Sequence, residues 1–244
     1  MGGAGRSPRV SILVPALDEE AAIPPLVDNL RSLCRPPEFE VILIDGGSRD
    51  GTAGRFEGLT DRGGPWLSAR VVRAERAGRA GQMNEGALRA QGDVLLFLHA
   101  DTGLPREAIR MVADALRVPA VVGGGFRHRF TGGGLLLRVI SLWATARSLL
   151  LGIHYGDQAM FVRRAVFEAL GGFRDIPLFE DIELSRAMRL AGRVRTLPLP
   201  ARTSSRRLRA RGVMRTVVRF GWLKLRYRLG TDPALLRAGY PDVR

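Results

Sequence analysis

The chain has 244 residues, 45% of them hydrophobic, which is enough apolar material for one sizeable domain and excludes a largely disordered protein. Cys34 is the only cysteine, so an intrachain disulfide and a cysteine metal cluster are both excluded. The net charge of +14 lies in the last part of the chain: residues 184–244 carry 16 Lys and Arg against 2 Asp and Glu, and residues 1–183 are neutral.

The two ends of the chain differ in composition. Residues 1–8 are rich in glycine and lack the apolar stretch of a signal peptide, so we expect a flexible N-terminus. The basic C-terminal part predicts a surface for phosphate groups or anionic lipid, although a solvated basic face has the same composition.

Apolar runs alternate with helical patterns in the first half of the chain. The expected strands are Val10–Val14, Val41–Ile44, Ala69–Val72 and Val94–Leu98. The expected helices are the segment with Ile23, Leu26, Val27 and Leu30, then Gln82–Ala90, then Pro105–Leu116. The alternation predicts an α/β fold with a mostly parallel, twisted sheet flanked by helices, and the continuous Val94–Leu98 run predicts a strand covered on both faces.

The pattern changes after Ala120. A strand is expected at Val121–Phe126, followed by an apolar helix at Leu135–Leu151 that contains Arg138 and Arg147. Two arginines in 17 residues make a poor membrane span, so we expect a buried or interfacial amphipathic helix.

Polar clusters follow three of the expected strands. Asp18-Glu19 follows the first strand, Asp45-Gly46 the second, and His99-Ala100-Asp101 the fourth. Ligands of parallel sheets bind beyond the carboxyl ends of the strands, so this placement predicts one binding edge. Asp45 suits a ribose or base N–H but also an ordinary Asx turn. Asp101 suits Mg²⁺ or Mn²⁺ but also the N-cap of a helix.

Glu180-Asp181 opens a predicted helix whose apolar face contains Leu184 and Met188. Asp181 lies on the inner side of that face, where it could act as a general base towards a hydroxyl group. A favourable interaction with the helix dipole explains the same position.

Three further segments carry polar groups. Residues 155–158 contain Asp157 and Gln158 and could orient a ligand or form a tight turn. Residues 78–84, which contain Arg79 and Asn84, lie between a strand and a helix and could hold phosphate, although they match neither the P-loop nor the dinucleotide-binding fingerprint. Arg206 and Arg207 follow hydroxyl residues and could contact a diphosphate or remain solvated.

Together these segments resemble one known family. VSILVPALDE at residues 10–19 and VILIDGGSRDGT at 41–52 resemble the opening of family 2 glycosyltransferases of the GT-A fold. GRAGQMNEGA, LLFLHADT, YGDQAMFVRR, GGFRDIPLFEDIELSRAMRLAG and TSSRRLRARG are similar to a bacterial branch associated with radical-SAM and selenium-domain genes.

The resemblance implies an inverting, metal-dependent transfer of a sugar from a nucleoside diphosphate sugar, with UDP favoured, to a hydroxyl acceptor. It implies a GT-A domain over residues 9–200, with a Rossmann-like nucleotide-binding half and an acceptor half, followed by a basic helical extension over 201–244. Asp181 would be the base with Glu180 beside it, and Asp101 would hold Mg²⁺ or Mn²⁺. The expected nucleotide-sugar-binding residues are Pro15, Ala16, Asp18, Glu19, Asp45, Gly46, Arg79, Asn84, His99, Ala100, Asp157, Gln158, Arg206 and Arg207.

Two features depart from the family pattern: His99 replaces the first carboxylate of the Asp-x-Asp motif, and the Gln-x-x-Arg-Trp motif of processive members is absent. We therefore expect single transfers. A nucleotidyltransferase and a nucleic-acid-binding protein remain alternatives, although the tail has too few aromatic residues for a stacking platform and we expect no nucleic-acid partner. The extension is expected to pack on the domain or to bind the membrane at the cytoplasmic face, with a lipid or lipid-linked acceptor.

Overall fold

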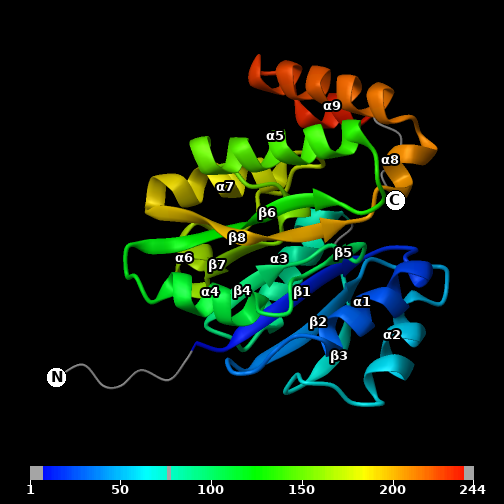
Figure 1. Ribbon diagram of the computed structural model, residues 1–244, viewed down its shortest axis with the longest axis vertical. Coiled ribbons are helices and arrows are strands. Elements are labelled where there is room, and N and C mark those ends of the chain that lie inside the picture. The colour runs from blue at the N-terminus through cyan, green and yellow to red at the C-terminus, as the bar shows by residue number, and fades with distance from the viewer. Residues whose placement is uncertain (1–7, 76–77, 239–244) are drawn as a thin grey trace.

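The computed structural model describes residues 8–75 and 78–238, and it contains a twisted eight-stranded sheet flanked by helices (Figure 1). The strand order is β3-β2-β1-β4-β7-β6-β8-β5. The strands are β1 (Val10–Ala16), β2 (Phe39–Asp45), β3 (Ala69–Arg73), β4 (Val94–Phe97), β5 (Thr102–Gly103), β6 (Val121–Phe130), β7 (Met160–Arg163) and β8 (Arg193–Thr203). The predicted N-terminal segment lies, except for Pro8, outside the described residues.

Helices alternate with strands up to β4 as expected, and α2 between β2 and β3 is an additional helix that the sequence pattern did not indicate. The α-helices are α1 (Ile23–Arg31), α2 (Thr52–Thr60), α3 (Arg79–Arg89), α4 (Ala108–Leu116), α5 (Leu135–Leu151), α6 (Arg164–Ala169), α7 (Glu180–Ala191), α8 (Arg206–Ala210), α9 (Val213–Arg228) and α10 (Pro233–Ala238), and the short 3₁₀ helices are η1 (Glu20–Ala22) and η2 (Gly156–Gln158).

The sheet is parallel from β3 through β4 and mixed beyond. β7 runs antiparallel to both of its neighbours, β8 is parallel to β6, and β5 is antiparallel to β8. The predicted α/β class with a sheet flanked by helices is confirmed, and the parallel character belongs mainly to the half formed by β1, β2, β3 and β4.

The core explains this arrangement. β2 is buried along its whole length, and β4 is buried as its continuous apolar sequence predicts. One apolar cluster joins the sheet to α1, α2 and α4, and a second joins its other face to α3, α6 and α7. The helices therefore cover both faces and leave the carboxyl ends of β1, β2 and β4 open at one edge.

The helix α5 turns its small and hydroxyl residues inward. Leu137, Ser141, Ala144 and Ser148 are buried against the protein, whereas most of its leucines are exposed. The Ser141 hydroxyl accepts a hydrogen bond from the Phe130 N–H at 3.0 Å, which attaches the helix to the end of β6. Of the two expectations for this segment, an interfacial rather than a buried helix agrees with the exposure.

The C-terminal segment is helical, and α9 packs on the domain. Phe220, Leu223 and Tyr227 of α9 meet Phe179 and Ile182 near the start of α7. The strand β8 continues through residue 200, so the helical extension begins at α8. Within the described part of the chain, no helix combines the length and apolar character needed to cross a bilayer.

Candidate active site

The carboxyl ends of β1 and β2 are joined by a buried amide side chain. Ala16 and Asp45 are register partners at the ends of the two strands. The Gln82 side-chain amide on α3 donates to the carbonyl oxygens of both Ala16 and Ile44, at 2.8 Å each. A side chain added at Gly46 would collide with Gln82, so the glycine permits this close approach.

The loops after β1 and β2 are held together by hydrogen bonds. Asp18 accepts from the Arg49 N–H at 2.8 Å, and the Glu19 N–H donates to the Thr52 hydroxyl at 2.8 Å. Asp45 accepts from the N–H and the hydroxyl of Ser48. Asp45 therefore forms the Asx turn that its sequence allows, which fixes its carboxylate at the sheet edge.

The end of β4 carries His99 and Asp101. Burial, followed by the charge of Arg79, lowers the pKa of His99 well below its usual value, so the imidazole is neutral at pH 7. Burial raises the pKa of Asp101, and the guanidinium groups of Arg207 and Arg79 oppose that rise. Asp101 does not cap α4, which starts seven residues later at Ala108.

The start of α7 places two carboxylates at the same edge. Phe179 precedes the helix in the left-handed region at φ 70°, a conformation that is costly outside glycine and concentrates at functional sites. Burial, followed by the neighbouring Asp181, raises the pKa of Glu180 to about 7. Burial also raises the pKa of Asp181, while the hydrogen bond from the Gly156 N–H opposes the rise.

Asp181 and His99 lie on either side of Gly156. The Gly156 N–H donates to the Asp181 carboxylate at 2.7 Å, and a Cβ built on Gly156 would come within 2.5 Å of the His99 Nε2. The next residue, Asp157, is close enough to both Asp101 and Asp181 to raise their pKa values. The structure therefore gathers four residues from three separate segments: His99 and Asp101 after β4, Asp157 in η2 and Asp181 in α7.

Two arginines face these carboxylates. Arg79, the first residue of α3, lies 3.7 Å from the Glu180 carboxylate and opposes the pKa rise of Asp101 and Asp181. Arg207 on α8 forms an ion pair with Glu19 of the loop after β1. The pair joins the loop after β1 to the helix α8.

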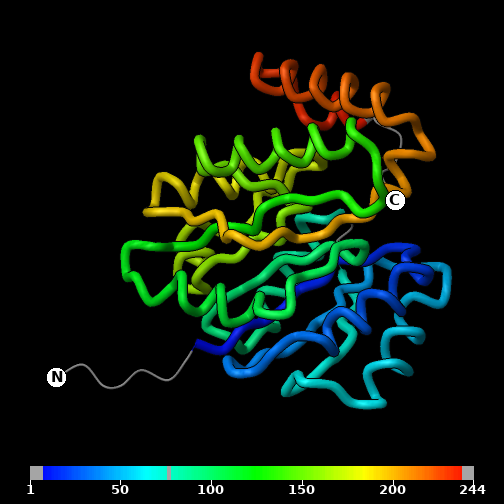
Figure 2. Tube along the Cα trace, in the orientation of Figure 1, coloured from blue at the N-terminus to red at the C-terminus, as the bar shows by residue number. Residues whose placement is uncertain are grey.

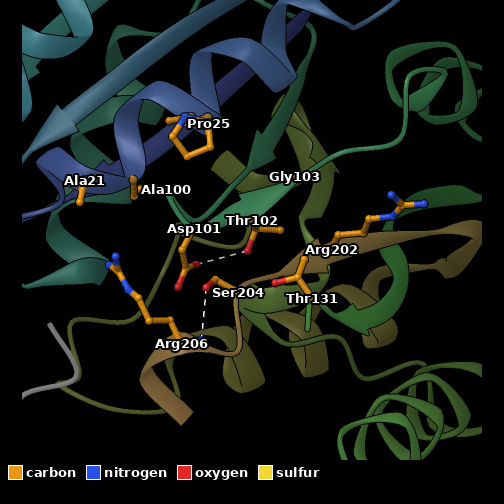
Figure 3. A pocket seen from close by; sticks show the side chains of 12 residues that line it. Ala21, Pro25, Ala100, Asp101, Thr102, Gly103, Thr131, Arg202, Ser204 and Arg206 are labelled. Atoms are coloured by element: carbon orange, nitrogen blue, oxygen red, sulfur yellow. Dashed lines mark hydrogen bonds between the residues drawn. The ribbon is translucent and has the colours of Figure 1, made fainter. Parts of the chain in front are cut away.

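A cavity of about 350 Å³ opens beside Asp101, between η1, the start of α1 and the end of β8 (Figure 3). Asp101, Thr102, Ser204 and Arg206 supply its polar lining, whereas Arg202 points away from Asp101. A second cavity of about 430 Å³ adjoins Asp18, Glu19 and Arg206. Both cavities lie on the α1 side of the carboxylates, and Glu180 and Asp181 line neither.

Two of the expected binding residues have other partners. The Asn84 side chain bonds to both the N–H and the carbonyl of Phe173, so it joins α3 to the segment before α7. Gln158 is fully buried and bonds to Phe126, Ser148, Tyr155 and Arg147. Because these bonds use both ends of each side-chain amide, the structure separates Asn84 and Gln158 from the group around Asp101.

The sequence interpretation missed three residues that shape the site. Gln82 bridges two strand ends, as described above. His128 is buried behind Asp157, with its Nε2 3.4 Å from the carboxylate. Lys224 on α9 donates to the Tyr155 hydroxyl at 3.0 Å, and Asp181 is close enough to oppose the lowering of its pKa. These contacts join residues far apart in sequence, so no local pattern signals them.

The acidic group offers oxygen ligands of the type that Mg²⁺ and Mn²⁺ prefer. Asp157 Oδ1 is buried without a hydrogen-bond partner among the described residues, and Asp157 lies near Asp101. In the same part of the chain, no group of three or more His, Cys, Asp or Glu has the geometry of a complete metal site. Such a cation fits here if Asp101 and Asp157 are supplemented by phosphate oxygens of a ligand.

The fold and this edge define an α/β protein with a charged group of side chains at the carboxyl ends of its strands, the place where such sheets bind ligands. The model of glycosyl transferase family 2 matches residues 11–171, which is more than half of the chain, so the protein belongs to that family. The narrower bacterial branch stays a prediction.

Two relatives show the range of proteins to which the chain is similar. One is the undecaprenyl-phosphate 4-deoxy-4-formamido-L-arabinose transferase of Pseudomonas paraeruginosa, 31% identical over 71% of this chain and 52% of the relative. Another is the beta-monoglucosyldiacylglycerol synthase of Synechocystis, 27% identical over 75% of this chain and 40% of the relative. The chain thus spans about half the length of these curated relatives or less.

Solved structures agree with the fold. The Pyrobaculum calidifontis mannosyltransferase PcManGT, in complex with GDP-Man and Mn²⁺, aligns with a TM-score of 0.65 and 25% identity, over 82% of this chain and 57% of that protein. Residues 1–349 of S. aureus TarS in complex with UDP-GlcNAc align with a TM-score of 0.64 and 19% identity, over 80% of this chain and 58% of that one. The second likeness concerns the fold alone.

Proposed function

We propose that the protein is an inverting, metal-dependent glycosyltransferase that moves a sugar from a nucleoside diphosphate sugar, with UDP favoured, to a hydroxyl acceptor. The observation that carries this proposal is the meeting of Asp101, Asp157 and Asp181 with Arg79 and Arg207 at one sheet edge. Sugar transfer from such a donor needs a cation site, phosphate-binding cations and a base, and this group supplies candidates for each.

The donor would lie along the carboxyl ends of β1, β2 and β4. Asp45 is held by its turn beside Ala16, where it can accept hydrogen bonds from a base or ribose. Arg79 and Arg207 can offset the charge of the diphosphate. Arg207 is paired with the Glu19 carboxylate, so a bound diphosphate would replace Glu19 as the anionic partner of this arginine.

Asp101 and Asp157 would hold Mg²⁺ or Mn²⁺ together with diphosphate oxygens. The bound cation would stabilise negative charge on the leaving diphosphate. His99 is neutral and adjoins Gly156, so it adds no positive charge that would repel the cation.

Asp181 would act as the base. Its carboxylate is fixed by the Gly156 and Ile182 N–H groups at 2.7 Å each, and burial raises its pKa towards the range in which a base can accept a proton. The acceptor hydroxyl would lose its proton to Asp181 while its oxygen attacks the anomeric carbon. The bond from that carbon to the diphosphate oxygen breaks on the opposite face, so the configuration inverts.

The acceptor would approach from the side of α9, where Tyr155 and Lys224 adjoin Asp181. The names of the two relatives refer to undecaprenyl phosphate and to a glucosyldiacylglycerol, both lipids. They support a lipid or lipid-linked acceptor and a peripheral enzyme at the cytoplasmic face of the cell membrane. In this arrangement the transferase domain includes β8 to its end at Thr203, and the basic helical extension begins at α8.

A thermal-shift panel tests the donor part of the proposal. UDP, GDP and their sugars are added with and without Mn²⁺, because a ligand that binds the folded state raises the melting temperature. We expect one nucleotide to give a larger shift with Mn²⁺, and Asp101→Asn to lose that increment. Asp114→Asn is the matched control, since Asp114 is an exposed carboxylate on α4 that pairs with Arg117.

An equal shift with and without Mn²⁺ in the unmodified protein would remove the metal from the proposal. Product analysis separates the nucleotidyltransferase alternative, because sugar transfer releases a nucleoside diphosphate and nucleotidyl transfer releases pyrophosphate.

A further inference from the structure

The helix α5 presents an apolar face to solvent. The exposed large side chains occupy one side of the helix, and Leu142 and Leu150 are 69% and 82% exposed. On this side lie Leu135, Val139, Leu142, Trp143, Leu149 and Leu150, and Leu136 and Leu151, which lie nearer the buried side, are 39% and 49% exposed. The opposite side, with Ser141 and Ser148, faces the protein. A water-facing helix normally has the reverse arrangement, and a contiguous exposed apolar patch marks an interaction surface.

The helix α9 carries a second apolar stripe. Its exposed apolar residues recur at every third or fourth position, which places them on one face of the helix. The stripe consists of Met214, Val218, Trp222, Leu225 and Leu229, the last directly after the helix, and Val217 beside it is 37% exposed. Arg215 and Arg226 flank this stripe, while Phe220 and Leu223 point to the domain. The helix α9 therefore packs on the domain through one face and exposes a second apolar face to solvent.

The two helices lie at the same end of the molecule, away from α2 and β3 (Figure 2). The Lys224 ammonium of α9 lies 5.1 Å from the Trp143 ring centroid of α5, so the helices are neighbours. Lys224 also bonds to Tyr155, two residues before Asp157. The apolar surface thus adjoins the acceptor side of the cleft.

The positive charge of these segments favours an anionic bilayer over a second copy of the protein as the partner of this surface. Residues 131–156 and 204–231, which include α5, α8 and α9, contain ten arginines and one lysine and no aspartate or glutamate. A second copy of the protein would bring like charges together across this surface, which is unfavourable. An anionic bilayer offers negative headgroups to the arginines and an apolar interior to the leucines and tryptophans.

We propose that α5 and α9 together form the surface by which the enzyme docks on an anionic lipid bilayer, with their exposed apolar side chains in the membrane interface and the arginines among the headgroups. This proposal rests on the proposed function. Docking would hold the acceptor side of the cleft next to membrane lipids, from which a lipid acceptor could enter.

The protein's three tryptophans provide a direct test. Trp143 and Trp222 are exposed on α5 and α9, whereas Trp66 is only 9% exposed and serves as an internal reference. Binding to vesicles of phosphatidylcholine with phosphatidylglycerol should shift the tryptophan fluorescence to shorter wavelength. Brominated lipids in the vesicles should quench the tryptophans that enter the membrane interface. Trp143→Phe and Trp222→Phe should each remove part of this signal, which assigns both helices to the interface.

Vesicle co-sedimentation measures the contribution of α5. The combined variant Leu142→Gln, Leu149→Gln, Leu150→Gln should lower the partition coefficient roughly tenfold or more, because each leucine loses an apolar contact with lipid. The control is Leu88→Gln, a leucine that is 83% exposed on α3, and it should bind like the unmodified protein. Added salt should weaken binding because it screens the arginines.

Absence of retention on the anionic vesicles at physiological salt would overturn the docking, as would full retention of the triple variant. A concentration-dependent dimer that the triple variant abolishes would assign the surface to a second copy instead. The nucleotide thermal shift separates the two proposals. A protein that shows the shift but does not bind vesicles would contradict only the docking. A protein that binds vesicles but shows no shift would contradict only the transferase assignment.

Discussion

The cleft and the α5–α9 surface both depart from the usual distribution of side chains, in opposite directions. The cleft region, meaning the charged sheet edge, contains Asp101, Glu180 and Asp181, and burial raises the pKa of each. The α5–α9 surface exposes leucines and tryptophans. Buried charge lowers the stability of the folded state itself, whereas exposed hydrocarbon contributes little to it and gains only from an external partner. Mutations of the buried groups should therefore change the stability or catalysis of the protein itself, whereas mutations of the exposed apolar side chains should change binding to a partner.

The largest expected effect is on catalysis in the cleft. Asp181→Asn should reduce the turnover number by about 10²–10⁴-fold, because the amide cannot accept the acceptor's proton. The nucleotide thermal shift should persist, since the donor contacts lie on other residues. The control is Glu183→Gln, which changes a carboxylate on the same helix that pairs with Arg174 and Arg186. Near-normal transfer by Asp181→Asn would end the base assignment.

Two apolar truncations compare the core with the outer surface directly. Ile109 on α4 is fully buried, so Ile109→Ala should lower the free energy of unfolding by about 2–5 kcal/mol. Leu142 on α5 is mostly exposed, so Leu142→Ala should change it by less than about 0.5 kcal/mol. Urea unfolding of both variants measures the difference. A large loss in Leu142→Ala would show that α5 is covered by protein in solution.

Buried charge should make the cleft sensitive to pH. The pKa of Glu180 is raised from 4.5 to about 7, so the unfolded state loses this proton at lower pH than the folded state does. The contribution of Glu180 to stability therefore falls as pH rises from about 4.5 to about 7. Glu180→Gln should stabilise the protein by about 1–3 kcal/mol at pH 8, and by nearly nothing at pH 4. Equal effects at both values would refute this.

The smallest expected effect lies where the two regions meet, at Lys224. Burial, followed by the charge of Arg147, lowers the pKa of this amine from 10.5 to about 8. Because the unfolded state keeps the proton to higher pH, this group adds stability as pH rises from about 8 to about 10. The free energy of unfolding of Lys224→Met should lack that rise between pH 8 and pH 10. The difference from the unmodified protein should be under about 1 kcal/mol because the side chain is partly exposed. Lys224 is the only lysine, so isotope-labelled lysine reports its pKa directly by NMR.

The strands β1 to β4, their parallel order and the helices α1, α3 and α4 could be predicted from the sequence, because local apolar periodicity and short connections determine them; the helix α2 was not expected. The placement of Asp18, Asp45 and Asp101 at one edge followed from the same logic, since carboxyl ends of parallel strands share an edge. The helix α3 starts three residues earlier than expected, which makes Arg79 its first residue.

The roles of Asn84 and Gln158 could not be predicted in this way. Both are amide side chains next to motif residues, but their partners, such as Phe173 and Phe126, lie 89 and 32 residues away along the chain. Only the folded chain shows that these bonds use the donors and acceptors that a ligand would need.

By itself, the sequence determined the family, the strands of the first half of the chain and the amphipathic character of the segment that forms α5, because these depend on residues close together in the chain. The tertiary structure alone decided which way the stripes face and which carboxylates meet. Periodicity places an apolar stripe on a helix, but whether protein or solvent covers it depends on the elements packed against it. In α5 the sheet contacts the serine side, so the leucines remain outside.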